Sequence, residues 1–214
     1  MNAPMKERPI LFSAPMVNAI REGRKTQTRR VVKLQPRSRA DIGHLGAGVP
    51  FIRNPEITRP NLLCPYGQPG DRLRVKEAAW MWCERVPNGT TKTGRKKWHY
   101  VPMREAPIHY AADRQTKPAI NVVSPNTGNQ WGWRLKIGRF LPRWASRIEL
   151  ELTGVRVEQL CSIKMDDVFA EGCMLSTSKQ EPRDFMNLWE SINGAGSWAV
   201  NPWVWVIEFK RVNA

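Results

Sequence analysis

The chain has 214 residues, of which 41% are hydrophobic, so it is long enough to bury a core. Its 34 Lys and Arg outnumber 19 Asp and Glu, and the formal net charge of +15 predicts a polyanionic partner, nucleic acid before a membrane surface. No apolar run is long enough to span a bilayer and no signal-peptide core is present, which excludes a membrane-spanning class. We therefore expect a cytoplasmic protein without a membrane partner.

The first part of the chain predicts a strand, a helix and a second strand. Residues 8–13 ("RPILFS") favour a strand, and 14–23 favour a short helix that ends at Gly23. Residues 26–34 are β-prone and predict a strand that leaves this helix. Residues 35–63 are rich in Pro, Gly and Arg without a period, so we expect a long loop.

The rest of the chain predicts further strands, two more helices and a second basic loop. The predicted strands lie within 66–82, 108–113, 146–160 (with a bulge at Gly154) and 201–212; the helices are 164–174 and 181–192; the loop is 84–130. This order predicts a mainly β, α+β fold. We expect a single domain over 1–214 built as a small mixed β-barrel with short flanking helices.

Cysteine, histidine and glycine patterns point to no metal or nucleotide cofactor. The spacings of the four cysteines and three histidines fit no zinc-site pattern, and G-x-G-x-x-G and P-loop motifs are absent. We expect the four cysteines to be reduced and to pack as ordinary core residues, as in a cytosolic protein. We accordingly predict no metal and no cofactor, and the sequence leaves the oligomeric state open.

The stretch "EGRKTQTRR" at 22–30 concentrates positive charge and hydroxyl groups at a helix–strand junction. Arg24 and Lys25 precede the strand, on which Thr26, Thr28 and Arg30 share one face. Hydroxyls and an arginine fork suit phosphate oxygens or base edges. The alternative is a solvated charged surface with ordinary strand threonines.

The same stretch matches G-x-K-x-x-T-x-R, and with it the chain resembles ASCH domains, which belong to the PUA-like β-barrel superfamily. The blocks "PGDRLRVKE", "ELTGVRVEQLCSIKMDDVFAEG" and "WVWVIEFKRV" follow in the family's order. The blocks at 64–71, 142–148 and 201–209 resemble the larger ASCH proteins of phages and prophages. Arg74 departs from them, because they often have an aromatic residue there.

The resemblance implies a nucleic-acid-binding cleft beside the helix–strand junction, with RNA favoured over DNA, in a phage or prophage accessory protein. Some small ASCH proteins similar at the Lys–Thr motif are acetylcytidine amidohydrolases, and others are reported as ribonucleases. Carried over by position, their catalytic groups would be Lys25, Thr28 and Glu171. A hydrolase on the same cleft, and a binder of a host protein, therefore remain alternatives.

Two further candidates lie outside the first motif. Glu77 ends a strand of basic residues and is either a salt-bridge partner or a ligand for a base edge. In "RFLPRWASRI", the arginines flank an aromatic and a hydroxyl side chain, and an Arg–Trp pair can sandwich a base. Alternatively, the tryptophan closes the end of the barrel and the arginines bind nearby carbonyls. The candidates in this block are Arg139, Arg143, Trp144, Ser146 and Arg147.

Overall fold

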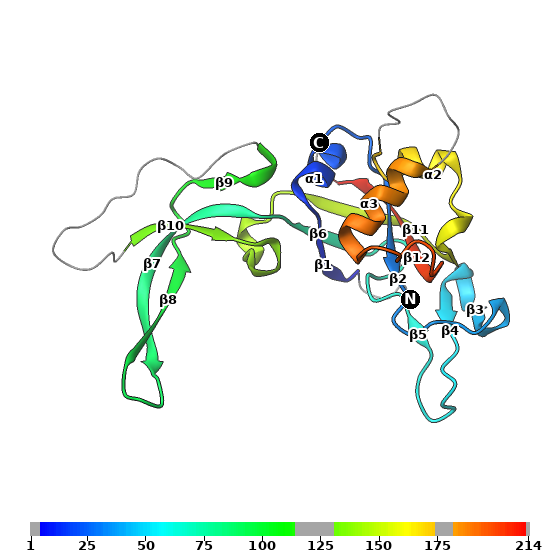
Figure 1. Ribbon diagram of the computed structural model, residues 1–214, viewed down its shortest axis with the longest axis horizontal. Helices are drawn as coiled ribbons and strands as arrows, with labels where there is room; N and C mark the ends of the chain where they lie inside the picture. The colour runs from blue at the N-terminus through cyan, green and yellow to red at the C-terminus, as the bar shows by residue number, and fades with distance from the viewer. Residues whose placement is uncertain (1–4, 114–130, 174–181, 213–214) are drawn as a thin grey trace. The chain divides into compact units, whose positions relative to one another are not determined.

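The computed structural model describes residues 5–113, 131–173 and 182–212 (Figure 1). It is a mixed α+β fold made mainly of strands (40%) with a few short helices. The chain forms two compact units. Unit 1 comprises Met1–Ile10, Ala19–Val75 and Ile148–Ala214, and unit 2 comprises Leu11–Asn18 and Lys76–Arg147. The predicted α+β class is confirmed, and the single predicted domain contains two compact units.

A five-stranded sheet with the order β1-β6-β11-β12-β2 forms the centre of unit 1. Its strands are β1 (Glu7–Leu11), β2 (Gln27–Val31), β6 (Arg72–Lys76), β11 (Glu149–Gln159) and β12 (Trp203–Arg211). The register between β11 and β12 shifts between Leu152 and Gly154, which confirms the predicted bulge. Strand β12 lies between two neighbours, and residues 204–207 are buried on both of its faces.

The described residues contain three short α-helices, near the positions that the sequence predicts. They are α1 (Ala14–Arg21), α2 (Met165–Ala170) and α3 (Arg183–Asn193). Phe185 and Trp189 of α3 pack with Val168 of α2 onto Val204 and Val206 of β12. These side chains follow the spacing of an amphipathic helix, so one face of α3 contributes to the core and the other meets solvent.

The prediction of a closed barrel is wrong, because the described sheets do not close. The prediction of a loop over 35–63 is also wrong. This segment contains a three-stranded sheet, β3-β4-β5, whose strands are β3 (Ile42–His44), β4 (Pro50–Ile52) and β5 (Leu62–Leu63), with 3-10 turns at Arg39–Asp41 and Gly46–Gly48. A Cβ on Gly43 would lie 2.2 Å from the Phe51 ring, so the ring packs over this glycine and would have to shift for any side chain there.

Unit 2 is built on a second sheet with the order β10-β7-β8, with β9 also paired to β7. The strands are β7 (Ala79–Thr90), β8 (Lys96–Pro102), β9 (Ile108–Tyr110) and β10 (Trp131–Lys136). Its core joins Met81 and Cys83 of β7 to Leu141 and Ala145, which lie in and beside short 3-10 turns. The predicted strand at 108–113 corresponds to β9.

The predicted loop over 84–130 is wrong for residues 84–102, which form the β7–β8 hairpin; residues 114–130 lie outside the described part of the chain. The hairpin turns at Thr91–Gly94, where Gly94 has a φ of +77° and donates its N–H to the Thr91 carbonyl. Within the described residues, no helix combines the length and apolar character that crossing a membrane requires.

Candidate nucleic-acid interface

The segment after α1 carries a lysine into the interior of unit 1. Lys25 forms an isolated antiparallel bridge with Glu171, and the Thr26 N–H donates to the Ala170 carbonyl at 2.8 Å. Gly172 has a φ of +84°, and a Cβ there would lie 2.9 Å from the Cβ of Lys25. Glycine is therefore required for the close approach that places Glu171 beside Lys25.

Lys25, Arg29 and Glu171 together form what we call the buried charge centre. Lys25 Nζ lies 2.8 Å from Glu171 Oε2, and Arg29 Nη1 lies 3.1 Å from Glu171 Oε1. The three residues are only 2%, 4% and 4% exposed. Burial lowers the pKa of the Lys25 ammonium group, and Glu171 opposes that shift. The Glu171 carboxylate thus lies between two buried cations and pairs with both.

A chain of ion pairs connects this centre to the surface of unit 1. Arg29 also binds Glu158 and lies 3.1 Å from Asp167. Both carboxylates contact Arg156, at 3.2 Å for Glu158 and 2.8 Å for Asp167, and Arg156 also binds Glu208. Burial alone would raise the pKa of Asp167, but hydrogen bonds and the two arginines hold it below its ordinary value.

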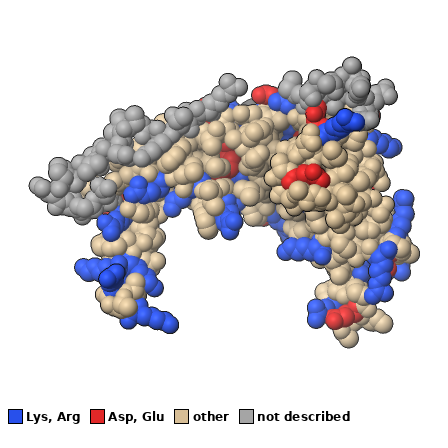
Figure 2. Space-filling view, viewed as in Figure 1, with Lys and Arg blue, Asp and Glu red and all other residues tan. Residues whose placement is uncertain are grey.

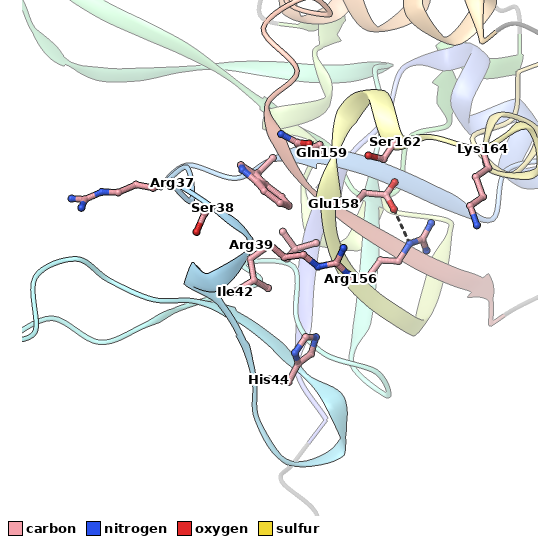
Figure 3. Close-up of a pocket in the computed structure, with 12 residues that line it drawn as sticks. Arg37, Ser38, Arg39, Ile42, His44, Arg156, Glu158, Gln159, Ser162 and Lys164 are labelled. Carbon is pink, nitrogen blue, oxygen red and sulfur yellow. Dashed lines mark hydrogen bonds and ion pairs between the residues drawn. The ribbon is translucent and has the colours of Figure 1, made fainter.

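At the surface this chain of pairs reaches a cavity of about 910 Å³, which we call the basic groove (Figure 3). Arg37 and Arg39 line it from the segment before β3, and Arg156 lines it from β11; in Figure 3 the Arg37 side chain extends away from Arg156. Lys164, directly before α2, and Trp203, the first residue of β12, complete its lining. The groove is therefore assembled from four separate stretches of unit 1.

The described lining of the basic groove contains more cationic than anionic side chains. Glu158 is the single acid among its described lining residues, and Arg29 and Arg156 already bind it. Arg37, Arg39 and Lys164 are exposed, and no described carboxylate lies within ion-pair distance of their side chains. Three cations thus face solvent without an internal counter-charge, which suits an anionic ligand.

The residues of the first predicted motif have different environments. Thr28 is buried on β2, opposite Ile207, whereas Thr26 is exposed. Arg24 donates to the Gly172 carbonyl at 3.0 Å and to Glu22, and Arg30 is half-buried opposite Trp205. A solvated charged surface therefore does not describe Lys25, Thr28 or Arg29.

Glu77 and Arg147 pair with each other in unit 2. Arg147 donates from Nε and Nη2 to the two oxygens of Glu77, at 2.8 and 3.1 Å, and from Nη1 to Asp113 at 2.7 Å. Its guanidinium lies 3.9 Å from the centre of the Tyr110 ring. Glu77 is 2% exposed. Of the two alternatives for Glu77, this geometry is that of a salt-bridge partner rather than that of a ligand for a base edge.

The other residues of the second predicted block border the core of unit 2. Arg139 and Arg143 are exposed, and Trp144 is half-buried against the core. The Ser146 N–H donates to the Arg143 carbonyl at 3.1 Å. The described guanidinium over the Trp144 ring belongs to Arg104, at 5.8 Å, rather than to one of the three predicted arginines.

The cations of the basic groove were not among the residues predicted from the sequence. Arg37 and Arg39 belong to the stretch that we expected to be a loop, and their alternation with serine in "PRSRA" was a usable indication of an anion-binding segment. Arg156 and Lys164 carry no such pattern. Only the fold brings them to the same cavity.

Comparison with known proteins returned no match to a protein-family model, to a curated protein or to a solved structure. Among the described residues, no group of three or more His, Cys, Asp or Glu side chains is arranged to hold a metal ion.

Proposed function

We propose that this protein binds nucleic acid through the basic groove of unit 1, as an ASCH-type member of the PUA-like superfamily. The observation that carries the proposal is the set of three exposed cations, Arg37, Arg39 and Lys164, that line one cavity without a carboxylate partner among the described residues. Phosphates are anions that such a lining binds well. The ordered ASCH motifs favour RNA over DNA.

The size and chemistry of the groove agree with a nucleotide-sized ligand. Its volume of about 910 Å³ lies within the range of ligand sites. Trp203 and His44 supply ring faces on which a base can stack, and Gln159 and Ser162 supply hydrogen-bonding groups. Charge, stacking and hydrogen bonding are thus present in the same cavity.

A salt titration tests this proposal. Fluorescently labelled single-stranded RNA of 12 nucleotides is titrated with wild type, R39A and K164A at 50 and 200 mM salt. We expect each substitution to weaken binding about tenfold and to reduce the salt slope by about 0.7, as for one lost phosphate contact. The matched control is R59A, since Arg59 is 69% exposed, pairs only with Glu56 among described residues and lies outside the groove.

Equal affinities for R39A, K164A and R59A would remove the basic groove from the proposal. Binding that does not respond to salt would instead favour the host-protein alternative, in which an apolar interface dominates. Circular dichroism of each variant separates loss of binding from loss of fold.

A second candidate function, a hydrolase, is supported by the pair of Lys25 and Glu171. A buried lysine with a lowered pKa is suited to act as a base, and Thr28 is buried on the strand that follows it. Incubation with N4-acetylcytidine, followed by chromatography, tests this candidate. Release of cytidine and acetate by wild type but not by folded K25Q would support it, and no product from wild type would reject this substrate.

A further inference from the structure

The β7–β8 hairpin of unit 2 is a two-stranded ribbon over much of its length. Strand β10 pairs with β7 only as far as Glu84, and β9 only as far as Met81. In the described part of the chain, β7 from Arg85 to its end pairs with β8 alone. Six residues of strand correspond to roughly 20 Å of ribbon. We call residues 85–103 the basic hairpin.

The basic hairpin carries positive charge without any acid. Its sequence, "RVPNGTTKTGRKKWHYVPM", contains five Lys and Arg and no Asp or Glu. Figure 2 shows Lys and Arg atoms, in blue, gathered at the end of the hairpin in the lower left of the view. Four of the five, Lys92, Arg95, Lys96 and Lys97, are exposed, and no described carboxylate is within ion-pair distance of them.

Aromatic rings hold two further cations on one face of this sheet. The Arg85 guanidinium lies 4.4 Å from the centre of the Trp98 ring, and the Arg134 guanidinium of β10 lies 3.9 Å from that of Tyr100. Tyr100 is opposite Arg85 in the ladder, so the two stacked pairs are adjacent. Stacking orients a guanidinium while its N–H groups stay available to an acceptor.

The surroundings of the ribbon give no structural reason for this charge. Pro87, Asn88, Lys97 and Trp98 are exposed, although they point to different faces, so neither face of the outer ribbon is covered by the described core. A bare two-stranded hairpin is marginally stable in water, and adjacent like charges destabilise it further. An external polyanion would relieve this repulsion.

We propose that the basic hairpin binds duplex DNA by entering the major groove, with its lysines and arginines on the flanking phosphates. Two strands about 4.8 Å apart, with their side chains, fit a major groove about 12 Å wide. The major groove of duplex RNA is too narrow and deep to admit them. A single strand is disfavoured because the Trp98 and Tyr100 rings of the hairpin, on which bases would stack, already contact the Arg85 and Arg134 guanidinium groups.

This inference rests on the proposed nucleic-acid function but uses a surface of unit 2, outside the basic groove. The test uses the full chain with three labelled probes: a 16-base-pair DNA duplex, the same duplex in RNA, and the 12-nucleotide single-stranded RNA. The variant K92Q/R95Q/K96Q/K97Q removes four charges from exposed positions. The control K92R/R95K/K96R/K97R keeps all four charges in the same places.

We expect the neutral variant to bind duplex DNA at least 30-fold more weakly at 150 mM salt, with a salt slope smaller by about 3–4. The charge-conserving control should retain wild-type affinity, and single-stranded RNA binding should change less than threefold. If the neutral variant fails to fold by circular dichroism, K92Q/R95Q, which alters only residues before β8, gives the same comparison with about half the change in slope.

Each contrary result has a distinct meaning. Wild-type affinity for duplex DNA in the neutral variant would overturn the role of the hairpin while leaving the basic groove untouched. Equal loss for duplex RNA and duplex DNA would overturn insertion into the major groove. Failure of wild type to bind any of the three probes would overturn both the hairpin inference and the proposed function.

Discussion

The buried charge centre and the basic hairpin use the same residue types in opposite ways. Lys25 and Arg29 are almost fully buried and share Glu171, whereas Lys96 and Lys97 are exposed and have no described carboxylate nearby. A buried cation requires a partner within the fold, because leaving water is costly. An exposed cation without a partner costs little and stays available to an external anion. Positive charge alone therefore does not identify a binding surface. Whether a cation has a carboxylate partner within the fold distinguishes a structural cation from one that is available to a ligand.

The largest effect should come from breaking the buried charge centre. E171Q removes the negative charge that lies 2.8 Å from the buried Lys25 ammonium group, while Arg29 keeps Glu158 and Asp167, so we expect the free energy of unfolding to fall by about 3–5 kcal/mol. Urea denaturation measures this. The matched control is E151Q, because Glu151 pairs with Lys210 at 3.1 Å on the surface and should cost less than about 1 kcal/mol. Similar losses of unfolding free energy in E171Q and E151Q would contradict the distinction between buried and exposed ion pairs.

A backbone substitution tests how tightly the same centre is packed. G172A adds a methyl group 2.9 Å from the Lys25 Cβ at a φ of +84°, and it should destabilise the protein by about 2–4 kcal/mol. Gly23 has a φ of +75° with nothing within 4 Å, so G23A should cost only about 1 kcal/mol. Thermal unfolding of the two variants separates crowding from backbone strain. Equal costs would mean that the contact with Lys25 is loose.

Asp71 of unit 1 is a buried acid whose carboxylate, like that of Glu171, has its partners within the fold. Asp71 accepts hydrogen bonds from the Lys6 N–H at 2.9 Å, from Arg8 at 2.7 Å and from the Gln68 N–H at 3.2 Å. Burial alone would raise the pKa of Asp71, but these bonds hold it below its ordinary value. Its stabilising contribution is therefore present above about pH 4 and is lost as the pH falls through the lowered pKa.

We expect D71N to lower the free energy of unfolding by about 1–2 kcal/mol at neutral pH. Between pH 5 and 3 the loss of stability should be shallower in D71N than in wild type, because the variant has no carboxylate to protonate at this position. Urea denaturation at several pH values measures both quantities. Parallel pH profiles would show that Asp71 does not contribute to acid sensitivity.

The smallest effect on stability is expected in the basic hairpin. W98A removes an exposed ring and its contact with Arg85, so it should cost about 0.5–1 kcal/mol or less. Its affinity for duplex DNA should nevertheless fall several-fold, because Arg85 loses its orientation. Thermal unfolding measures the change in stability. A large loss would contradict this expectation, because it would show that Trp98 stabilises the fold rather than only orienting Arg85.

Short sequence patterns correctly predicted the strands, helix ends and bulges that are specified by residues adjacent in the sequence. The strand predicted within 66–82 includes β6, Gly23 marked the end of α1, and Gly154 marked the bulge in β11. The β7–β8 hairpin was missed, because polar and basic residues cover its outer half and give no apolar alternation. The strands β3 to β5 were missed because they have only two or three residues each.

The candidate site depends on contacts that no local pattern specifies. Lys25 and Glu171 are 146 residues apart, and their proximity was expected only through the resemblance to ASCH domains. The basic groove joins Arg39 to Lys164, which lie far apart in the sequence and close together only in the folded unit. The motif at 22–30 drew attention to charges that are largely buried. Apart from Lys164, the exposed cations of the basic groove and the basic hairpin lie in stretches that we expected to be loops.

The central claim is that the unpaired cations of this protein bind nucleic acid, and a salt titration of the wild-type protein tests it most directly. Affinity for single-stranded RNA and for duplex DNA is measured by fluorescence anisotropy at 50, 100 and 200 mM salt. The account predicts binding to both at 50 mM, with at least a 30-fold loss for duplex DNA by 200 mM. No binding at 50 mM, or an affinity that does not change with salt, would contradict the account.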